Sequence, residues 1–102
     1  MAKKIEPVHP GEILREEFMA PLGLSMNRMA IDLRVPVTRI ADIVNGRRGI
    51  TADTALRLGR YFKSSPAFWM NLQTRYDLEV AEDESAAEVD RYVKPLEIGV
   101  GG

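Results

Sequence analysis

Residues 25–48, SMNRMAIDLRVPVTRIADIVNGRR, decide the fold of this chain. Ser25 is a favoured N-cap residue, and the apolar residues that follow it recur at helical spacing as far as Leu33. Residues 34–35 make a turn, and Pro36 suits the opening of a second helix, where its missing N–H costs nothing. The stretch is therefore predicted to form two short helices joined by a tight turn.

The second of these helices is predicted to bury one face and to expose the other. Helical spacing places Ile40, Ile43 and Val44 on the inner face. The outer face then carries Val37, Thr38, Arg39 and Asp42. Asn45–Gly46 ends the helix, because glycine readily adopts the left-handed conformation that follows a helix C-terminus.

Two helices in this arrangement are typical of a helix–turn–helix that binds DNA. In such a motif the N-terminal end of the second helix enters the major groove. The predicted base-reading residues are Val37, Thr38, Arg39 and Asp42. The free N–H groups at the start of the first helix favour a phosphate, and two adjacent arginines follow the second helix. The residues predicted to bind the DNA backbone are Ser25, Asn27, Asn45, Arg47 and Arg48.

Two of these roles have alternatives. Arg39 could bind O6 and N7 of a guanine, or it could contact only a phosphate. Asp42 could accept a hydrogen bond from a cytosine amino group, but an i,i+3 pair with Arg39 is the preferred interpretation. Because Pro36 and Val37 leave few polar groups at the start of the helix, we expect the DNA to be read partly through thymine methyl groups.

Charge is distributed unevenly along the 102 residues, which suffice for one domain with a modest core. Residues 26–63 hold eight lysines and arginines against three aspartates, a balance of +5. Residues 76–98 hold eight acids against two cations, a balance of −6. A basic middle suits a polyanion, which would repel the acidic end. We therefore expect a DNA-binding domain over 1–82 and an acidic C-terminal extension over 83–102 that faces a twin subunit or a basic partner.

The remaining helices are predicted from start and stop signals. A first helix begins near Pro10 and is stopped by Pro21 and Gly23. Thr51 caps a fourth helix, and Ser65–Pro66 opens a fifth.

The fifth helix is expected to bury an aromatic stripe, in the core or at a subunit interface. Its members are Phe68, Trp69, Leu72 and Tyr76. The acid-rich residues 82–85 are expected to fray this helix. One more short helix over 86–94 is possible, and residues 96–100 could pair as a strand at a dimer seam.

Nothing in the sequence indicates catalysis. The chain has no cysteine, which excludes disulfides and thiolate metal sites and fits a reducing cytosol. His9, the only histidine, is interpreted as part of a mobile lead-in and not as a metal ligand or catalytic base. The sequence shows neither a signal peptide nor an apolar run of membrane-spanning length. We expect a cytoplasmic protein without a cofactor.

Longer segments around the motif carry a resemblance to a known family. HPGEILREEFMAPLGLS (9–25), NGRRGIT (45–51) and TALRLGRYFKSSPAFWMNLQTRYDLEVAE (54–82) resemble the HigA (VapI-type) antitoxins of the phage-repressor-like, Xre-type helix–turn–helix group. HPGE and SPAFWMNLQTRYDL are its most specific parts. The resemblance implies an all-α, five-helix fold, usually a homodimer. It also implies autorepression of a toxin–antitoxin operon and neutralisation of a RelE-like, mRNA-cleaving toxin.

The chain departs from that group at the turn, where Arg34 stands in place of the common glycine. A left-handed conformation there would cost about 1 kcal/mol. Two other functions are compatible with the same sequence features. One is a protein-interaction module that masks a basic partner through the acidic C-terminal region without binding DNA. The other is a phage-type regulator that has no cognate toxin.

Overall fold

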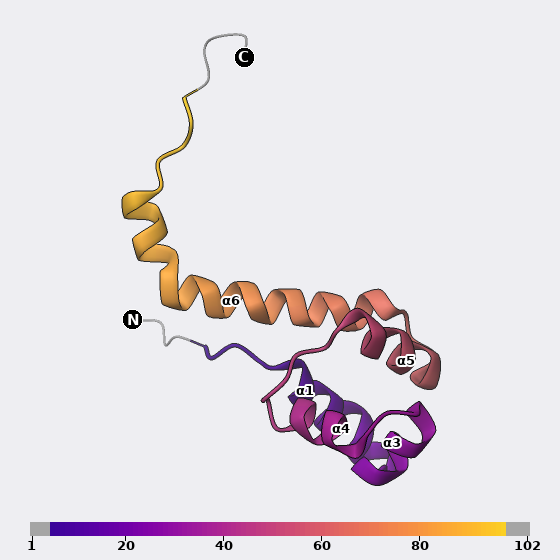
Figure 1. The fold of residues 1–102 in the computed structure, drawn as a ribbon. Helices are drawn as coiled ribbons and strands as arrows, with labels where there is room; N and C mark the ends of the chain where they lie inside the picture. The colour runs from indigo at the N-terminus through magenta and orange to yellow at the C-terminus, as the bar shows by residue number, and fades with distance from the viewer. Residues whose placement is uncertain (1–4, 98–102) are drawn as a thin grey trace.

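The computed structural model describes residues 5–97, and every regular element in that range is helical. The elements are α1 (Pro10–Ile13), the π-helical η1 (Leu14–Met19), α2 (Ala20–Leu22), α3 (Met26–Leu33), α4 (Val37–Val44), α5 (Ala52–Phe62) and α6 (Pro66–Tyr92). The first three follow one another without a break and make one helix. The predicted all-α, five-helix fold is thus confirmed (Figure 1).

The first helix continues through Pro21 to Leu22, so the prediction that this proline stops it is wrong. Proline lacks an N–H, and its ring crowds the carbonyl four residues earlier. The wider π-helical segment lies just before it, where the Ala20 N–H bonds to the carbonyl of Arg15, five residues back. Gly23, with φ 64°, then ends the helix in the left-handed conformation, as predicted.

The helix–turn–helix forms as predicted, apart from the place of the proline. The Ser25 hydroxyl caps α3 by accepting from the Arg28 N–H at 3.0 Å. Arg34 ends α3 with φ 62°, which confirms the left-handed turn. Pro36 is the extended N-cap residue of α4 and not its first helical residue, because its ψ is 144°.

The core lies where the first helix, α3, α4, α5 and the start of α6 meet. Its fully buried apolar side chains are Leu14, Met29, Ile40, Ile43, Ala55, Leu58 and Trp69. The Trp69 indole donates to the Ser64 hydroxyl at 3.0 Å, and its ring lies 4.9 Å from that of Phe18. The predicted aromatic stripe is only partly buried, since Phe68 is 39% exposed at its edge.

His9 caps the first helix and is not part of a mobile lead-in. Its Nδ1 accepts from the Gly11 N–H at 2.9 Å, and its ring packs edge-on against Tyr76 of α6 at 4.9 Å. Partial burial lowers the pKa of His9, although Asp77 acts in the opposite direction. The neutral ring that the cap requires is therefore favoured.

The last helix, α6, neither frays at residues 82–85 nor gives way to a separate helix over 86–94. It runs as one element from Pro66 to Tyr92, changing direction in its last part (Figure 1). Every side chain from Ala81 to Glu97 is exposed, so this part projects as an arm. The expected boundary between residues 82 and 83 falls inside α6 and stays a prediction. Part of the expected strand over 96–100 lies outside the described residues.

Candidate nucleic-acid interface

The four predicted base-reading residues share the outer face of α4. Val37 is 39% exposed, Thr38 is exposed, and Arg39 and Asp42 are half-buried. Their helix is anchored from behind by Ile40 and other apolar residues of its inner face, as predicted. The face is therefore a rigid surface on a packed helix, which suits a group that must be held in register with DNA.

Arg39 pairs with Asp53 in the first turn of α5, and not with Asp42. Its Nη1 donates to Asp53 Oδ2 at 2.8 Å. The preferred i,i+3 pair with Asp42 is wrong because the carboxylate of Asp42 is bound to the arginines of the next loop. A partner fourteen residues away replaces the local one.

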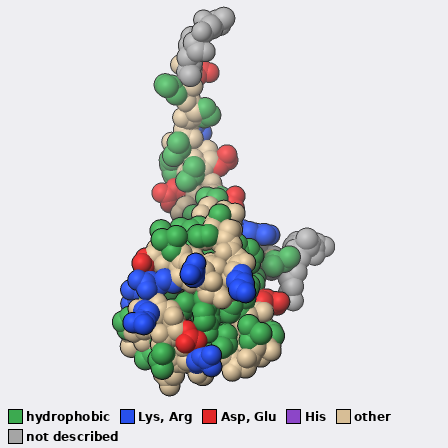
Figure 2. All heavy atoms as spheres, turned by 90° about the vertical axis from the view of Figure 1, so that its right-hand side faces the viewer, with side chains coloured by type: hydrophobic (Ala, Val, Ile, Leu, Met, Phe, Trp, Pro, Cys, Tyr) green, Lys and Arg blue, Asp and Glu red, His purple; other side chains and the backbone are tan. Residues whose placement is uncertain are grey.

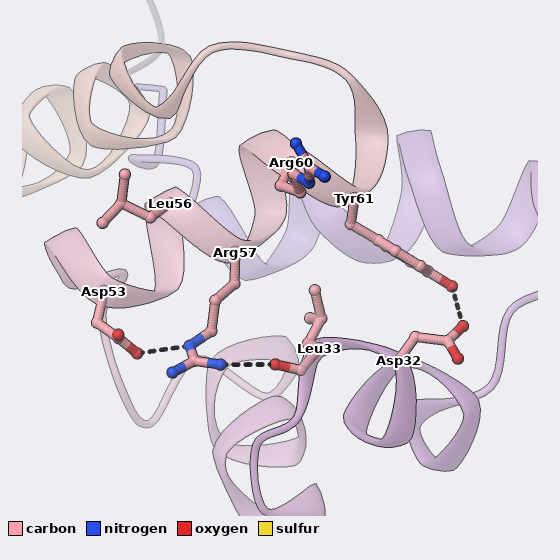
Figure 3. Close-up of a pocket in the computed structure, with 7 residues that line it drawn as sticks. All are labelled: Asp32, Leu33, Asp53, Leu56, Arg57, Arg60 and Tyr61. Atoms are coloured by element: carbon pink, nitrogen blue, oxygen red, sulfur yellow. Dashed lines mark hydrogen bonds and ion pairs between the residues drawn. The ribbon is translucent and has the colours of Figure 1, made fainter.

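Asp53 in turn is held by a second arginine that reaches across to α3. Arg57 donates from Nε to Asp53 Oδ2 at 2.9 Å and from Nη1 to the carbonyl oxygen of Leu33 at 2.9 Å (Figure 3). Arg57, and after it Arg39, lowers the pKa of the Asp53 carboxyl. Three helices thus contribute to the surroundings of one reading-face arginine.

The loop after α4 folds back on that helix. The carbonyl oxygen of Asp42 accepts the N–H groups of Arg47 and Arg48 at 2.7 and 3.2 Å. The carboxylate of Asp42 lies 3.1 Å from Arg47 Nη2 and 3.5 Å from Arg48 Nη2. Gly46 permits the fold with φ 76°, and Asn45 at the helix end is exposed. The two arginines predicted to bind phosphate are thereby presented beside the reading face.

A hollow of about 400 Å³ lies between the reading face and the start of α5. It is lined by Arg39, Arg48, Thr51, Asp53 and Thr54. The sequence predicted Thr51 as a helix cap. It does cap α5, since its hydroxyl accepts from the Thr54 N–H at 3.4 Å, and it also lines this hollow. Asp53 and Thr54 were not assigned to the site. The sequence did offer one indication of their role: both lie in the first turn of the helix that follows the paired arginines.

Ser25 and Asn27 lie at the start of α3, and both are exposed. The Ser25 hydroxyl is engaged in the cap, so a phosphate at this helix end would meet backbone N–H groups and the Asn27 side chain. The structure places these two residues on a different helix from the other predicted phosphate-binding residues.

A second hollow, of about 380 Å³, lies between α3 and α5 (Figure 3). Its lining residues are Asp32, Leu33, Asp53, Leu56, Arg57, Arg60 and Tyr61. The Tyr61 hydroxyl donates to Asp32, which raises the pKa of Tyr61, and the Asp32 pKa is lowered by that bond and by Arg28. Figure 2, which faces the right-hand side of Figure 1, shows basic side chains spread over the globular part with a few acids among them, and further acids along the projecting arm.

Within residues 5–97, no group of three or more histidine and acidic side chains could hold a metal ion. Over the same residues, no helix combines the length and apolar character needed to cross a bilayer.

Comparison with known proteins identifies relatives over most of the chain, although no family model matches it. Virulence-associated protein I of Dichelobacter nodosus is 56% identical over 77 residues, which are 76% of this chain and 71% of that protein. Antitoxin HigA-1 of Vibrio cholerae serotype O1 is 32% identical over 93 residues, 91% of this chain and 87% of that protein. The fold is similar to the solved structure of Pseudomonas aeruginosa antitoxin HigA with the higBA promoter, with a TM-score of 0.87 at 44% identity, covering 90% of this chain and 100% of that one.

Proposed function

This chain belongs to the HigA antitoxin family of helix–turn–helix proteins, and we propose from that membership that it represses transcription of its own operon as the antitoxin of a toxin–antitoxin pair. The observation that carries the proposal is the exposed face of α4 flanked by Arg47 and Arg48, in a fold whose relative was solved with promoter DNA. The proposed activity is binding, not catalysis, and its place is the cytoplasm.

In this proposal α4 lies in the major groove, and two copies bind a palindromic operator. Thr38 and Arg39 reach base edges, Val37 contacts a thymine methyl, and Asp42 orients the following arginines. Backbone phosphates are bound by Ser25, Asn27, Asn45, Arg47 and Arg48. A homodimer would place its two α4 helices about one turn of DNA apart, roughly 34 Å.

Operator binding is expected to weaken steeply with salt, since each phosphate contact releases counterions. Arg47→Ala and Arg48→Ala should each lower affinity for specific and unrelated DNA by a similar factor, and should reduce the slope of log K against log salt by about one unit. The measurement is a fluorescence anisotropy titration with DNA from upstream of the gene, at several salt concentrations.

Arg75→Ala is the matched control, because this arginine is 79% exposed on α6 and pairs with Glu79, four residues along the same helix. It should leave both affinity and slope unchanged. If all three variants bound like the original protein, the proposed phosphate surface would be wrong.

A second candidate function, capture of a basic protein partner, is favoured by the arm. Its exposed apolar side chains include Val89 and Tyr92, which are 51% and 68% exposed and lie three residues apart on α6. Acids surround them, and residues 76–97 carry a balance of −6. An acidic helix with exposed apolar side chains suits a partner with an apolar groove and a basic rim, such as a RelE-like toxin.

Co-expression with the neighbouring gene product tests this role. Glu84→Lys with Glu88→Lys should reduce recovery of the complex by tenfold or more, as like charges face the partner's rim, while operator binding persists. Glu17→Lys on the first helix is the control and should leave the complex intact. Retention of the complex by the arm variant would remove the arm from the toxin surface, and a complex without any operator binding would favour the interaction module over the repressor.

A further inference from the structure

Arg39 is the most restrained of the arginines around the reading face. Its side chain is 29% exposed, against 63% for Arg47 and 47% for Arg48. Its partner, Asp53, belongs to another helix, whereas Arg47 and Arg48 share a partner in the helix that they directly follow. The restraint on Arg39 therefore depends on where the start of α5 lies beside α4.

Asp53 is itself fixed. One oxygen, Oδ2, accepts from Arg39 at 2.8 Å and from Arg57 at 2.9 Å, and Arg57 also binds the last carbonyl of α3, that of Leu33. These bonds form one path from the end of α3 through α5 to α4. An exposed ion pair by itself fixes little, but here Asp53 also pairs with Arg57 of its own helix, and Arg57 is tied to α3.

The carboxylate has two consequences for what Arg39 can bind. It offsets part of the charge of the guanidinium, so a phosphate in the hollow that both residues line is attracted to Arg39 less strongly than it would be without the carboxylate. It also occupies Nη1 only, so the other N–H donors of the guanidinium remain for an acceptor pair such as guanine O6 and N7. Bidentate recognition requires the guanidinium plane to be held, which the pair with Asp53 does.

We propose that Asp53 is a positioning residue for specificity: it holds Arg39 for base edges and excludes it from a phosphate role. This rests on the proposed DNA-binding function and favours base recognition over a phosphate contact for Arg39. Asp53 touches no base. It acts through Arg39, and Arg57 supports it.

The test compares Asp53→Asn with the original protein on a panel of operators, each with one base pair changed. Arg39→Ala first identifies the base pair at which discrimination is lost. At that pair the original protein should discriminate about 5- to 100-fold, the range of a good bidentate contact. Asp53→Asn should reduce this to within about threefold, while affinity for unrelated DNA stays equal or rises.

A double-mutant cycle separates positioning from a general structural role. In the Arg39→Ala background, Asp53→Asn should have no further effect on affinity for the operator. Glu79→Gln is the matched control, since it removes a carboxylate that pairs with an arginine, Arg75, on α6 and away from the reading face, and it should leave discrimination intact. Thermal unfolding confirms that each variant is folded, and Asp53→Ser serves as the second variant because serine also suits a helix start.

The outcomes are distinguishable. Undiminished discrimination in folded Asp53→Asn and Asp53→Ser would overturn the positioning role while leaving the proposed function in place. The positioning role would also be overturned if Asp53→Asn lowered operator affinity by the same factor with and without Arg39. Absence of any sequence preference in the original protein would overturn the proposed function and this inference with it.

Discussion

Replacing Trp69 by alanine is expected to lower the free energy of unfolding by about 3–5 kcal/mol. The indole is fully buried, and its ring lies 4.9, 5.0 and 6.2 Å from those of Phe18, Phe68 and Phe62. Alanine would leave a cavity among them and would leave the Ser64 hydroxyl without its indole donor. Domains of this size have a total stability of about 5–15 kcal/mol, so this one change removes a large share of it.

Urea unfolding followed by circular dichroism measures the effect without relying on tryptophan fluorescence. Leu78→Ala is the matched control, since Leu78 lies on the same helix and is 59% exposed. It should change stability by less than about 0.5 kcal/mol. Equal losses in the two variants would mean that the start of α6 is no better packed than its middle.

The same experiment separates two interpretations of the aromatic residues. If Trp69 were a stacking platform for unpaired bases, alanine would weaken binding to single-stranded DNA by about 1–3 kcal/mol per base and leave the fold stable. The complete burial of the indole rules out such stacking in this conformation. A large loss of stability is therefore the expected signature.

Local signals predicted the helix boundaries well. Ser25, Thr51 and Ser65 each cap the helix that was expected after them, because a cap involves only the next three residues. The predicted end of the last helix was wrong, because no local cap signal marks where α6 ends. Acidic side chains were taken as a sign of fraying, but glutamate and alanine are good helix formers and continue a helix whose start is packed in the core.

The geometry of the candidate site was less predictable. The outer face of α4 follows from helical periodicity, and its exposure agrees with the prediction. The partner of Arg39 does not follow from periodicity, because Asp53 reaches it only through the packing of two helices across a loop. Sequence spacing favoured Asp42, which is nearer along the chain but is bound to the loop arginines instead.

The two segments that carry the family resemblance meet in the fold. His9 of HPGE packs against Tyr76 of SPAFWMNLQTRYDL, with ring centroids 4.9 Å apart. Gln73 of the second segment accepts from the Ile50 N–H at 2.6 Å, at the end of the loop that holds the paired arginines. These residues have a structural role that helical periodicity did not indicate: they fix the loop between them.

Replacing Gly11 by alanine is expected to destabilise the fold by about 3 kcal/mol, the upper part of the range for an overpacked core. In an ordinary helix the same change stabilises by about 0.5–1 kcal/mol, because alanine is the better helix former. Here a Cβ would lie 1.8 Å from the carbonyl oxygen of Ile43 and 2.6 Å from its carbon. Both are backbone atoms in the last turn of α4, so no side chain can move aside to make room.

The experiment is decisive because the expected change in stability is opposite in sign to that in an ordinary helix. We also expect an effect on DNA binding, because α1 and α4 must separate to admit the methyl group. The folded Gly11→Ala protein should bind the operator and all its single-base-pair variants more weakly by a similar factor. Arg39→Ala, in contrast, should lose discrimination at one base pair only. Glu12→Ala, at the exposed neighbouring position, is the control for helix propensity and should leave both stability and affinity nearly unchanged. A Gly11→Ala protein as stable as the original would show that α4 does not rest on α1 at this point. The requirement for glycine in HPGE would then need a different cause from the close approach to Ile43.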